Sequence, residues 1–200
     1  MDKLNITLKD NQKIFFSSDL HFGHRNVISF CDRPYSDVKE MHQALINNWN
    51  SVVSNEDIVF VLGDFFWFHG RHEIKKVVAK LNGKTIYVVP GNHCKREAYE
   101  LCDERLVLLD DISAIYLRYE EFGPITYEII LSHCPMMTWP HRDRGAFNFF
   151  GHIHSGPRTK AKVDQDLPLW EDLQYDIGVD NNNYTPIELS DIILKLKKEP

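Results

Sequence analysis

Five short polar clusters, each following an apolar run of strand length, are the residues in this chain whose types and spacing could do chemistry. They read Asp19-Leu20-His21, Gly63-Asp64, Gly91-Asn92-His93, Ser132-His133 and Gly151-His152-Ile153-His154. In open α/β sheets, ligands bind beyond the carboxyl ends of the strands. Carboxylate, imidazole and amide oxygen together suit divalent metals such as Mn, Fe, Zn, Ni or Co better than Ca or Mg. The clusters therefore predict a dinuclear metal centre at one edge of a sheet.

The spacing within the clusters suggests how the ligands converge. Asp64 stands alone after a buried-type strand and a glycine, so it is the natural bridge between two cations held roughly 3.5–4 Å apart. Asp19 and His21 are two positions apart, as are His152 and His154. Since residues i and i+2 point to the same side of an extended segment, we expect each pair to reach the metal edge on ordinary extended backbone. Each motif alone also fits a turn, a helix cap or a surface polar pair, so the prediction depends on the whole set.

The bulk properties are those of an ordinary globular protein. The chain of 200 residues is 43% hydrophobic and 26% charged, which predicts a single domain over residues 1–200 with a substantial core. A net charge of −6 disfavours a protein whose main task is to bind a nucleic-acid backbone. The chain has four cysteines without a C-x-x-C pair, no signal peptide and no long apolar run. These features predict a cytoplasmic protein that does not bind a membrane.

Hydrophobic periodicity predicts the elements that position the clusters. Over the first half of the chain, strands alternate with helices in the order strand 13–18, helix 37–53, strand 58–62, helix 73–81, strand 85–89 and helix 96–102. This alternation implies a largely parallel sheet with helices on its faces. A preceding strand, 5–9, is expected to form a hairpin with strand 13–18 around the turn-prone Asp10-Asn11. Ser36 is the expected N-cap of helix 37–53.

The second half of the chain has a different pattern. Strands 112–118 and 126–132 are expected to form an antiparallel pair around Phe122-Gly123-Pro124, and 148–150 and 174–179 add further strands. Pro186 is expected in the first turn of a final helix, 187–197. The irregular stretch 156–172 is the candidate for a mobile surface loop.

The motifs D-x-H, G-D, G-N-H, an isolated H and G-H-x-H, in that order from Asp19 to His154, resemble the calcineurin-like metallophosphoesterase superfamily. The ending Gly178-Val179-Asp180, followed by Tyr184-Thr185-Pro186, resembles its small bacterial- or phage-type members. The resemblance implies an α/β fold of two packed mixed β-sheets, a β-sandwich flanked by helices, with the dinuclear site at the carboxyl edge of the strands. It implies that one metal is held by Asp19, His21, Asp64 and His154, and the other by Asp64, Asn92, His133 and His152.

The same resemblance implies a reaction. The protein would be a metal-dependent phosphoesterase that hydrolyses a phosphomonoester or phosphodiester by attack of a metal-bridging hydroxide. The expected cofactors are two divalent ions, Mn first, with Fe, Zn, Ni, Co or Mg as alternatives. His93 matches the catalytic histidine of the family, which contacts the phosphoryl oxygens and protonates the leaving oxygen. Many members follow this histidine with an acidic residue that orients it, whereas Cys94 occupies that position here.

Other residues near the clusters are candidates for choosing the substrate. His24, Arg25 and Asn92 are the expected substrate-binding residues, and Arg25 would either hold a phosphate oxygen or lie on the surface of a helical turn. The run Phe65-Phe66-Trp67-Phe68 fits core packing or a wall that stacks a nucleobase. A second wall could come from Trp139, His141 and Arg142. We expect a small phosphorylated substrate, such as a nucleotide or cyclic nucleotide, in preference to nucleic acid.

A scaffold function is the alternative hypothesis. In this reading the chain keeps the metallophosphoesterase fold as a catalytically silent interaction module. Relatives of that kind usually lack the catalytic histidine or some of the ligands, whereas His93 and all the expected ligands are present in this sequence. The sequence therefore favours the enzyme.

Overall fold

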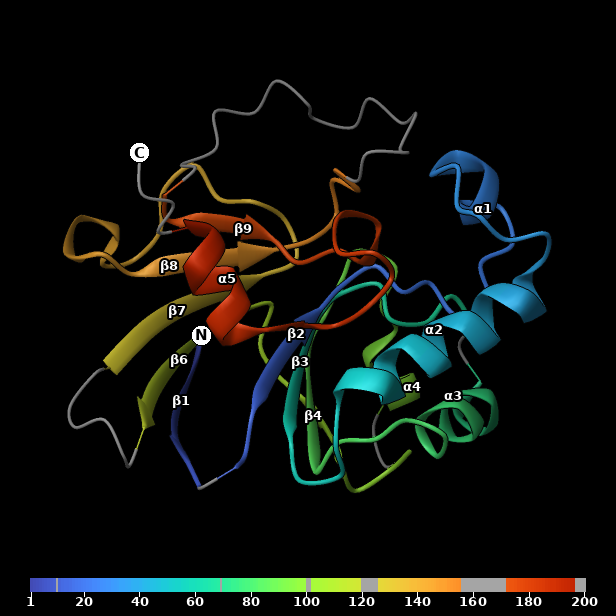
Figure 1. Ribbon diagram of the computed structural model, residues 1–200, viewed down its shortest axis with the longest axis horizontal. Helices are drawn as coiled ribbons and strands as arrows, with labels where there is room; N and C mark the ends of the chain where they lie inside the picture. The colour runs from blue at the N-terminus through green and yellow to red at the C-terminus, as the bar shows by residue number, and fades with distance from the viewer. Residues whose placement is uncertain (10, 69, 100–101, 120–125, 156–171, 197–200) are drawn as a thin grey trace.

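Two five-stranded β-sheets packed face to face form the centre of the computed structural model (Figure 1). The structure describes residues 1–200 apart from 10, 69, 100–101, 120–125, 156–171 and 197–200. The expected turn at Phe122-Gly123-Pro124, and all of the expected loop 156–172 except Asp172, lie outside the described residues. The α/β fold with two mixed sheets flanked by helices, which the family resemblance implies, is confirmed.

The first sheet carries the helical crossovers. Its strand order is β10-β2-β3-β4-β5, with bounds β2 (Ile14–Ser17), β3 (Ile58–Leu62), β4 (Thr85–Val89), β5 (Leu106–Leu108) and β10 (Ile187–Glu188). The strands β2 to β5 are parallel, and β10 pairs antiparallel with β2. Parallel neighbours require crossover connections. These contain the helices α1 (Val27–Phe30), α2 (Val38–Val52), α3 (Arg71–Val78) and α4 (Arg96–Tyr99).

The second sheet has the order β1-β6-β7-β8-β9. Its strands are β1 (Asp2–Leu8), β6 (Ile112–Tyr119), β7 (Thr126–Ser132), β8 (Phe147–Phe150) and β9 (Gln174–Asp176). The pair β6–β7 is antiparallel, as the sequence predicts, and the other three pairs are parallel. The strands β7 and β8 therefore end on the same side, beside the carboxyl ends of the first sheet.

The main core fills the space between the two sheets. Alternate residues of β2 show how the strand divides its side chains, because Phe16 joins this inner core while Phe15 joins the cluster under the helices. Phe16 and Phe60 stack at a centroid distance of 5.5 Å, and Phe60 stacks on Tyr87 at 4.9 Å. The final helix, α5 (Leu189–Leu196), closes this core with buried Ile192 and other apolar side chains. The core holds the strands rigid up to the edge where the polar clusters begin.

The helices α2 and α3 cover the outer face of the first sheet (Figure 1). Met41, Leu45 and Trp49 recur at helical spacing on the buried face of α2. The N-cap of α2 is Asp37, whose side chain accepts hydrogen bonds from the backbone of Lys39 and Glu40, so the expectation of a Ser36 cap is wrong. Ser36 instead donates to the Glu40 carboxylate from its backbone and its hydroxyl. A carboxylate one residue later reaches the orphan amides of the first turn better than the Ser36 hydroxyl does.

Two further expectations about local structure are wrong. The strands β1 and β2 form no hairpin, because β1 pairs with β6 and the chain crosses between the sheets at the turn that separates them. This crossing lets Ile6 and Leu8 complete the core between the sheets. Pro186 precedes the short strand β10, and the final helix begins only at Leu189. The pairing of Ile187 with Phe16 takes the two residues after the proline into the sheet.

The strand β9 is also shorter than expected. The expected strand 174–179 ends as β9 at Asp176, and the chain continues into the short helical turn η2 (Val179–Asn181). Within the described parts of the chain, no helix combines the length and the apolar character that crossing a bilayer requires.

Candidate metal centre

Five strand ends, from both sheets, deliver candidate ligands to one edge of the sandwich (Figure 1). The strands β2, β3, β4, β7 and β8 are followed in turn by Asp19, Asp64, Asn92, His133 and His152. Backbone hydrogen bonds tie the loops together: the His21 N–H donates to the Asp64 carbonyl at 2.9 Å, and the Gly151 N–H donates to the His133 carbonyl at 2.8 Å. The clusters thus converge because the strand order places these strand ends next to one another.

The candidate ligands have an unusual backbone conformation. Five of them lie in the left-handed region, with φ values of 57° for Asp19, 54° for His21, 46° for Asp64, 73° for His152 and 46° for His154. The expectation that the two i, i+2 pairs lie on extended backbone is therefore wrong. Aspartate and histidine visit this region more often than most residues. The conformation still costs on the order of 1–3 kcal/mol per residue, so the surrounding structure must hold it, and such strain clusters at functional sites.

Two glycines of the motifs are required by close approach to the ligands. A Cβ atom at Gly63 would collide with the His133 imidazole, and one at Gly91 would collide with the Asp64 carboxylate. Gly63 also has a positive φ of 89°. The glycines that precede Asp64 and Asn92 in the sequence therefore make room for ligands from neighbouring loops.

The first group of converging ligand atoms comes from Asp19, His21 and His154, and these atoms lie within 4.8 Å of one another. The imidazoles of His21 and His154 stack at a centroid distance of 5.3 Å. His154 donates from Nδ1 to the Asp180 carboxylate at 2.6 Å. This bond directs Nε2 toward Asp19, whose Oδ1 lies 3.9 Å away.

The second group consists of Asp19, Asp64 and His133. Asp64 Oδ2 lies 3.7 Å from His21 Nε2 and 3.6 Å from His133 Nε2, so this carboxylate stands between the two groups. His133 Nδ1 lies 2.8 Å from the Leu62 carbonyl, to which it must donate because a carbonyl only accepts. The lone pair of Nε2 then faces Asn92 Oδ1, 2.9 Å away. A cation would satisfy both of these acceptors.

Unsatisfied buried atoms test whether these residues fit metal ions. Asp19 Oδ1 and His21 Nδ1 are buried without a hydrogen-bond partner among the described residues. A buried polar atom left unpaired costs about 1–3 kcal/mol. His152 completes the surroundings, since its backbone N–H donates to Asp19 Oδ2 at 2.9 Å and its ring lies 5.0 Å from that of His133. The donor set, with carboxylates, imidazoles and one amide oxygen, fits two divalent metal ions.

The electrostatics of the group depend on burial and on one carboxylate. Burial lowers the pKa of His21 well below its usual value, which keeps this imidazole neutral and able to bind a metal. Burial also raises the pKa of Asp64. Burial would lower the pKa of His154, but its contacts with Asp180 and Cys31 outweigh that effect and raise it to about 11. A metal ion at His154 Nε2 would take the place of a ring proton.

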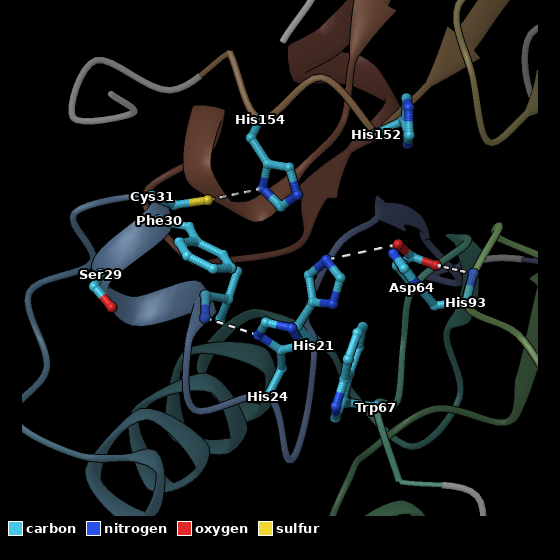
Figure 2. Close-up of a pocket in the computed structure, with 11 residues that line it drawn as sticks. His21, His24, Ser29, Phe30, Cys31, Asp64, Trp67, His93, His152 and His154 are labelled. Carbon is cyan, nitrogen blue, oxygen red and sulfur yellow. Dashed lines mark hydrogen bonds and ion pairs between the residues drawn. The ribbon is translucent and has the colours of Figure 1, made fainter. Parts of the chain in front are cut away.

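A cavity of about 670 Å³ opens beside these ligands (Figure 2). Its lining includes His21, Asp64, His152 and His154 together with the expected catalytic residue His93. His93 is exposed, and its backbone N–H donates to Asp64 Oδ1 at 3.2 Å. The expected catalytic histidine and four of the seven candidate ligands thus line one cavity.

The comparisons with known proteins agree with this geometry. A family model described as "Calcineurin-like phosphoesterase" matches residues 12–187. The chain belongs to this phosphoesterase family. Uncharacterized protein MJ1445 of Methanocaldococcus jannaschii is 31% identical over 188 residues, which cover 92% of this chain and 91% of the relative. The Gene 66 protein of Mycobacterium phage D29 is 30% identical over 186 residues, which cover 80% of this chain and 90% of the phage protein.

A solved structure has the same fold. The crystal structure of the protein of unknown function AQ665 from Aquifex aeolicus matches with a TM-score of 0.63 and 24% sequence identity. The match covers 91% of this chain and 98% of that chain. Membership of the phosphoesterase family supports hydrolysis of phosphate esters in general, and the fold places the five motifs where a metal centre can form.

The expected substrate-binding residues are placed differently from one another. His24 lines the cavity, and its Nδ1 accepts a hydrogen bond from the Val27 backbone at 2.7 Å. Asn92 is exposed and faces His133. Arg25 is exposed and does not belong to the described lining of the cavity.

The aromatic residues singled out in the sequence also lie in different parts of the structure. Phe65 and Phe66 are buried in the core under the helices, while Trp67 lines the cavity. Trp139 does not form a second wall of this cavity, because it packs on the outer face of the second sheet, where its indole donates to the Ala146 carbonyl. Closeness to His133 in the sequence therefore does not predict a place in the cavity, because the chain after His133 leads Trp139 to the outer face of the second sheet.

An ion pair between Arg33 and Asp180 supports the candidate ligands Asp19 and His154. The sequence analysis did not identify this pair. The Arg33 guanidinium donates to both oxygens of Asp180 at 2.9 and 2.8 Å, and the Arg33 side chain is 0% exposed. Burial would raise the pKa of Asp180, but the guanidinium holds it below its usual value. Arg33 also donates to the carbonyls of Asp19 and Leu20 at 2.7 and 3.1 Å. It thus connects the loop of one ligand with the carboxylate that orients His154.

Only one member of this ion pair can be identified from the sequence. The ending Gly178-Val179-Asp180 is one of the segments that resemble the family, so Asp180 can be singled out from the sequence. Arg33 lies between Asp32 and Pro34 in a segment without a ligand motif, and only the folded chain shows its role.

Metal removal is expected to destabilise the fold, because ions that bind only the native state add to its stability. At a free Mn²⁺ concentration of about 100 times its Kd, each ion adds about 2.7 kcal/mol to the free energy of unfolding. For a chain of this size that is a rise in Tm of roughly 5–11 °C for each ion, and roughly 11–22 °C for two ions, over the EDTA-treated protein. Thermal unfolding by circular dichroism measures the shift. An unchanged Tm after Mn²⁺ is restored would contradict a metal centre built on these residues.

Proposed function

We propose that this protein is a dinuclear metal-dependent phosphoesterase that hydrolyses a phosphomonoester or a phosphodiester. The observation that carries the proposal is a buried oxygen without a partner among the described residues, Asp19 Oδ1, beside the Asp64 carboxylate, whose Oδ2 lies 3.7 Å from His21 Nε2 and 3.6 Å from His133 Nε2. Such an arrangement is unfavourable without cations. The cavity next to it has the size of a small-molecule site, for which volumes of about 300–1,000 Å³ are typical.

The residues divide the work of the reaction. Two bound cations would supply activation of a water molecule and neutralise charge on the phosphoryl oxygens. Asp64 would hold both ions, and His133 and His154 would direct Nε2 to them because Nδ1 of each is already bonded to the protein. His93 would contact a phosphoryl oxygen and give a proton to the leaving oxygen.

The indole of Trp67 supports this role of His93. Its ring lies 4.7 Å from the His93 imidazole. Cys94, in the position where many relatives carry an acidic residue, is half-buried and packs against the core under the helices. We therefore assign the orientation of His93 to packing against Trp67 and to its backbone bond with Asp64.

We further propose Mn as the first choice of metal, with Fe, Zn, Ni, Co or Mg as alternatives, since the donor set mixes oxygen with imidazole nitrogen. The proposed substrate is a small phosphorylated molecule, such as a nucleotide or cyclic nucleotide. Nucleic acid is disfavoured by the net charge of −6. A cytoplasmic location is proposed because none of the four cysteines forms a disulfide.

The decisive assay uses two chromogenic esters, bis-p-nitrophenyl phosphate and p-nitrophenyl phosphate, with added Mn²⁺ and with metal content measured. The proposal expects turnover of at least one of them that is lost in EDTA and restored by Mn²⁺. If two ions bind and neither ester is hydrolysed, the scaffold hypothesis is favoured instead.

Substitution His93→Ala is expected to lower kcat by about 10²–10⁴-fold, the usual contribution of a general acid, while two metal ions stay bound. Metal content by mass spectrometry and steady-state kinetics measure the two effects separately. The matched control is His72→Ala, which removes another exposed histidine, on α3, and is expected to change neither quantity. Equal activity of the two variants would show that His93 has no catalytic role.

A further inference from the structure

The cavity beside the candidate metal centre has both polar and apolar lining residues. The polar ones include four of the candidate ligands, and the apolar ones, Val27, Phe30, Cys31 and Trp67, make up what we call its apolar side. Figure 2 shows Phe30 on the α1 side, across the cavity from Asp64. Phe30 is 60% exposed and Trp67 is 38% exposed, among the largest exposures of apolar side chains in the described chain.

These two aromatic side chains belong to one continuous row. The Phe30 ring lies 6.2 Å from that of His24, and the His24 ring lies 3.8 Å from that of Trp67 in an edge-on arrangement. Trp67 in turn contacts His93 at 4.7 Å. The row therefore runs from the exposed Phe30 to the expected catalytic histidine.

The row is held in place by backbone bonds and not by its own packing in the core. The Trp67 N–H donates to the Phe22 carbonyl at 2.8 Å, and the His24 ring is fixed by the Val27 N–H at 2.7 Å. Exposed apolar area on rigid supports, facing a cavity, favours a ligand that covers it. Apolar side chains exposed singly need no such explanation. Here both face the same cavity.

The charge of the lining limits what the ligand can carry. Among the described residues that line the cavity there is no lysine and no arginine. A second phosphate or carboxylate at the far end of the substrate would therefore meet no lysine or arginine among the described lining residues. A flat, uncharged group would instead stack on the exposed rings.

We propose that the apolar side of this cavity is a subsite for a planar aromatic substituent of the phosphate ester, such as a nucleobase, with Phe30 as its platform and Trp67 as the adjoining wall. The subsite rests on the proposed function for the placement of the phosphoryl group at the metal ions. It adds that the ester is selected through its aromatic part, so the preferred substrates are nucleoside or aryl phosphates and not sugar phosphates or polyphosphates.

Three phosphonates test the subsite without requiring turnover. Methylphosphonate, phenylphosphonate and cyclohexylphosphonate share the same non-hydrolysable head group, and their affinities for the Mn-loaded protein are measured by isothermal titration calorimetry. Stacking of one ring predicts phenyl binding about 5- to 150-fold tighter than methyl binding. The non-planar cyclohexyl group, of similar size, is expected to bind about 2- to 12-fold more weakly than phenyl, because it buries area without ring stacking.

Substitution Phe30→Ala is expected to remove most of the phenyl-over-methyl preference. Because the Phe30 side chain is 60% exposed, its removal is not expected to impair folding. Leu194→Ala is the matched control, since Leu194 is 70% exposed on α5, outside the described lining of the cavity. This control is expected to keep the preference unchanged.

Equal affinities for phenyl and methyl, equal affinities for phenyl and cyclohexyl, or a preference that survives Phe30→Ala would each overturn the subsite. Failure of the proposed function has a different signature. In that case neither p-nitrophenyl phosphate nor bis-p-nitrophenyl phosphate is hydrolysed, although the phenyl preference and its loss in Phe30→Ala are still measured.

Discussion

Replacement of Asp64 by alanine is expected to remove both metal ions and to reduce hydrolysis to the level without enzyme. Asp64 is the one described carboxylate with an oxygen within 4 Å of histidines from both ligand groups, at 3.7 Å from His21 and 3.6 Å from His133. Without it, each ion would lose a negatively charged ligand and the two would repel each other without a bridge. Metal content after dialysis in Mn²⁺, and kinetics with p-nitrophenyl phosphate, measure the outcome.

A second buried aspartate, Asp57, provides the control for this substitution. It lies just before β3, whereas Asp64 lies just after the same strand, and it accepts hydrogen bonds from the backbone of Lys13 and Ser54. Asp57→Ala is expected to lower stability but to keep two metal ions. If Asp64→Ala also kept two ions, the assignment of Asp64 as the bridging ligand would be wrong.

The variant Arg33→Met is expected to lower the free energy of unfolding by about 3–5 kcal/mol, because it removes the guanidinium from a buried ion pair and leaves Asp180 with His154 as its remaining charged partner. It also removes the hydrogen bonds to the carbonyls of Asp19 and Leu20. Since Asp180 orients His154, we expect metal affinity to fall by about 10–100-fold. Urea unfolding of the metal-free protein and metal titration measure the two effects.

The double variant Arg33→Met/Asp180→Leu separates stability from the positioning of His154. Replacing both members of a buried ion pair by apolar residues is often neutral, so much of the lost stability is expected to return. Metal affinity is expected to stay low, because Asp180→Leu removes the Nδ1 partner of His154. Recovery of metal affinity together with stability would show that the pair acts only on the fold.

Much of the fold and the ligand set can be predicted from the sequence because the information is local. Each ligand follows directly on a strand, and runs such as 58–62 and 85–89 are apolar enough to indicate buried parallel strands. The glycine before Asp64 is a local signal as well. Local patterns do not predict which strand a segment pairs with when more than one pairing is available. The pairing of β1 with β6 and the entry of Ile187 into a strand depend on residues more than 90 positions away in the chain.

By itself, the sequence determined the types of the candidate ligands, their order and the strands that precede them. Only the tertiary structure decided how these groups face one another. The left-handed backbone of residues such as His21 and His154, the buried contact of Arg33 with Asp180, and the exposure of Phe30 toward the cavity all arise from loops of different strands pressed together. The physical reason is that such conformations are unfavourable in an isolated segment, and contacts between distant segments must stabilise them.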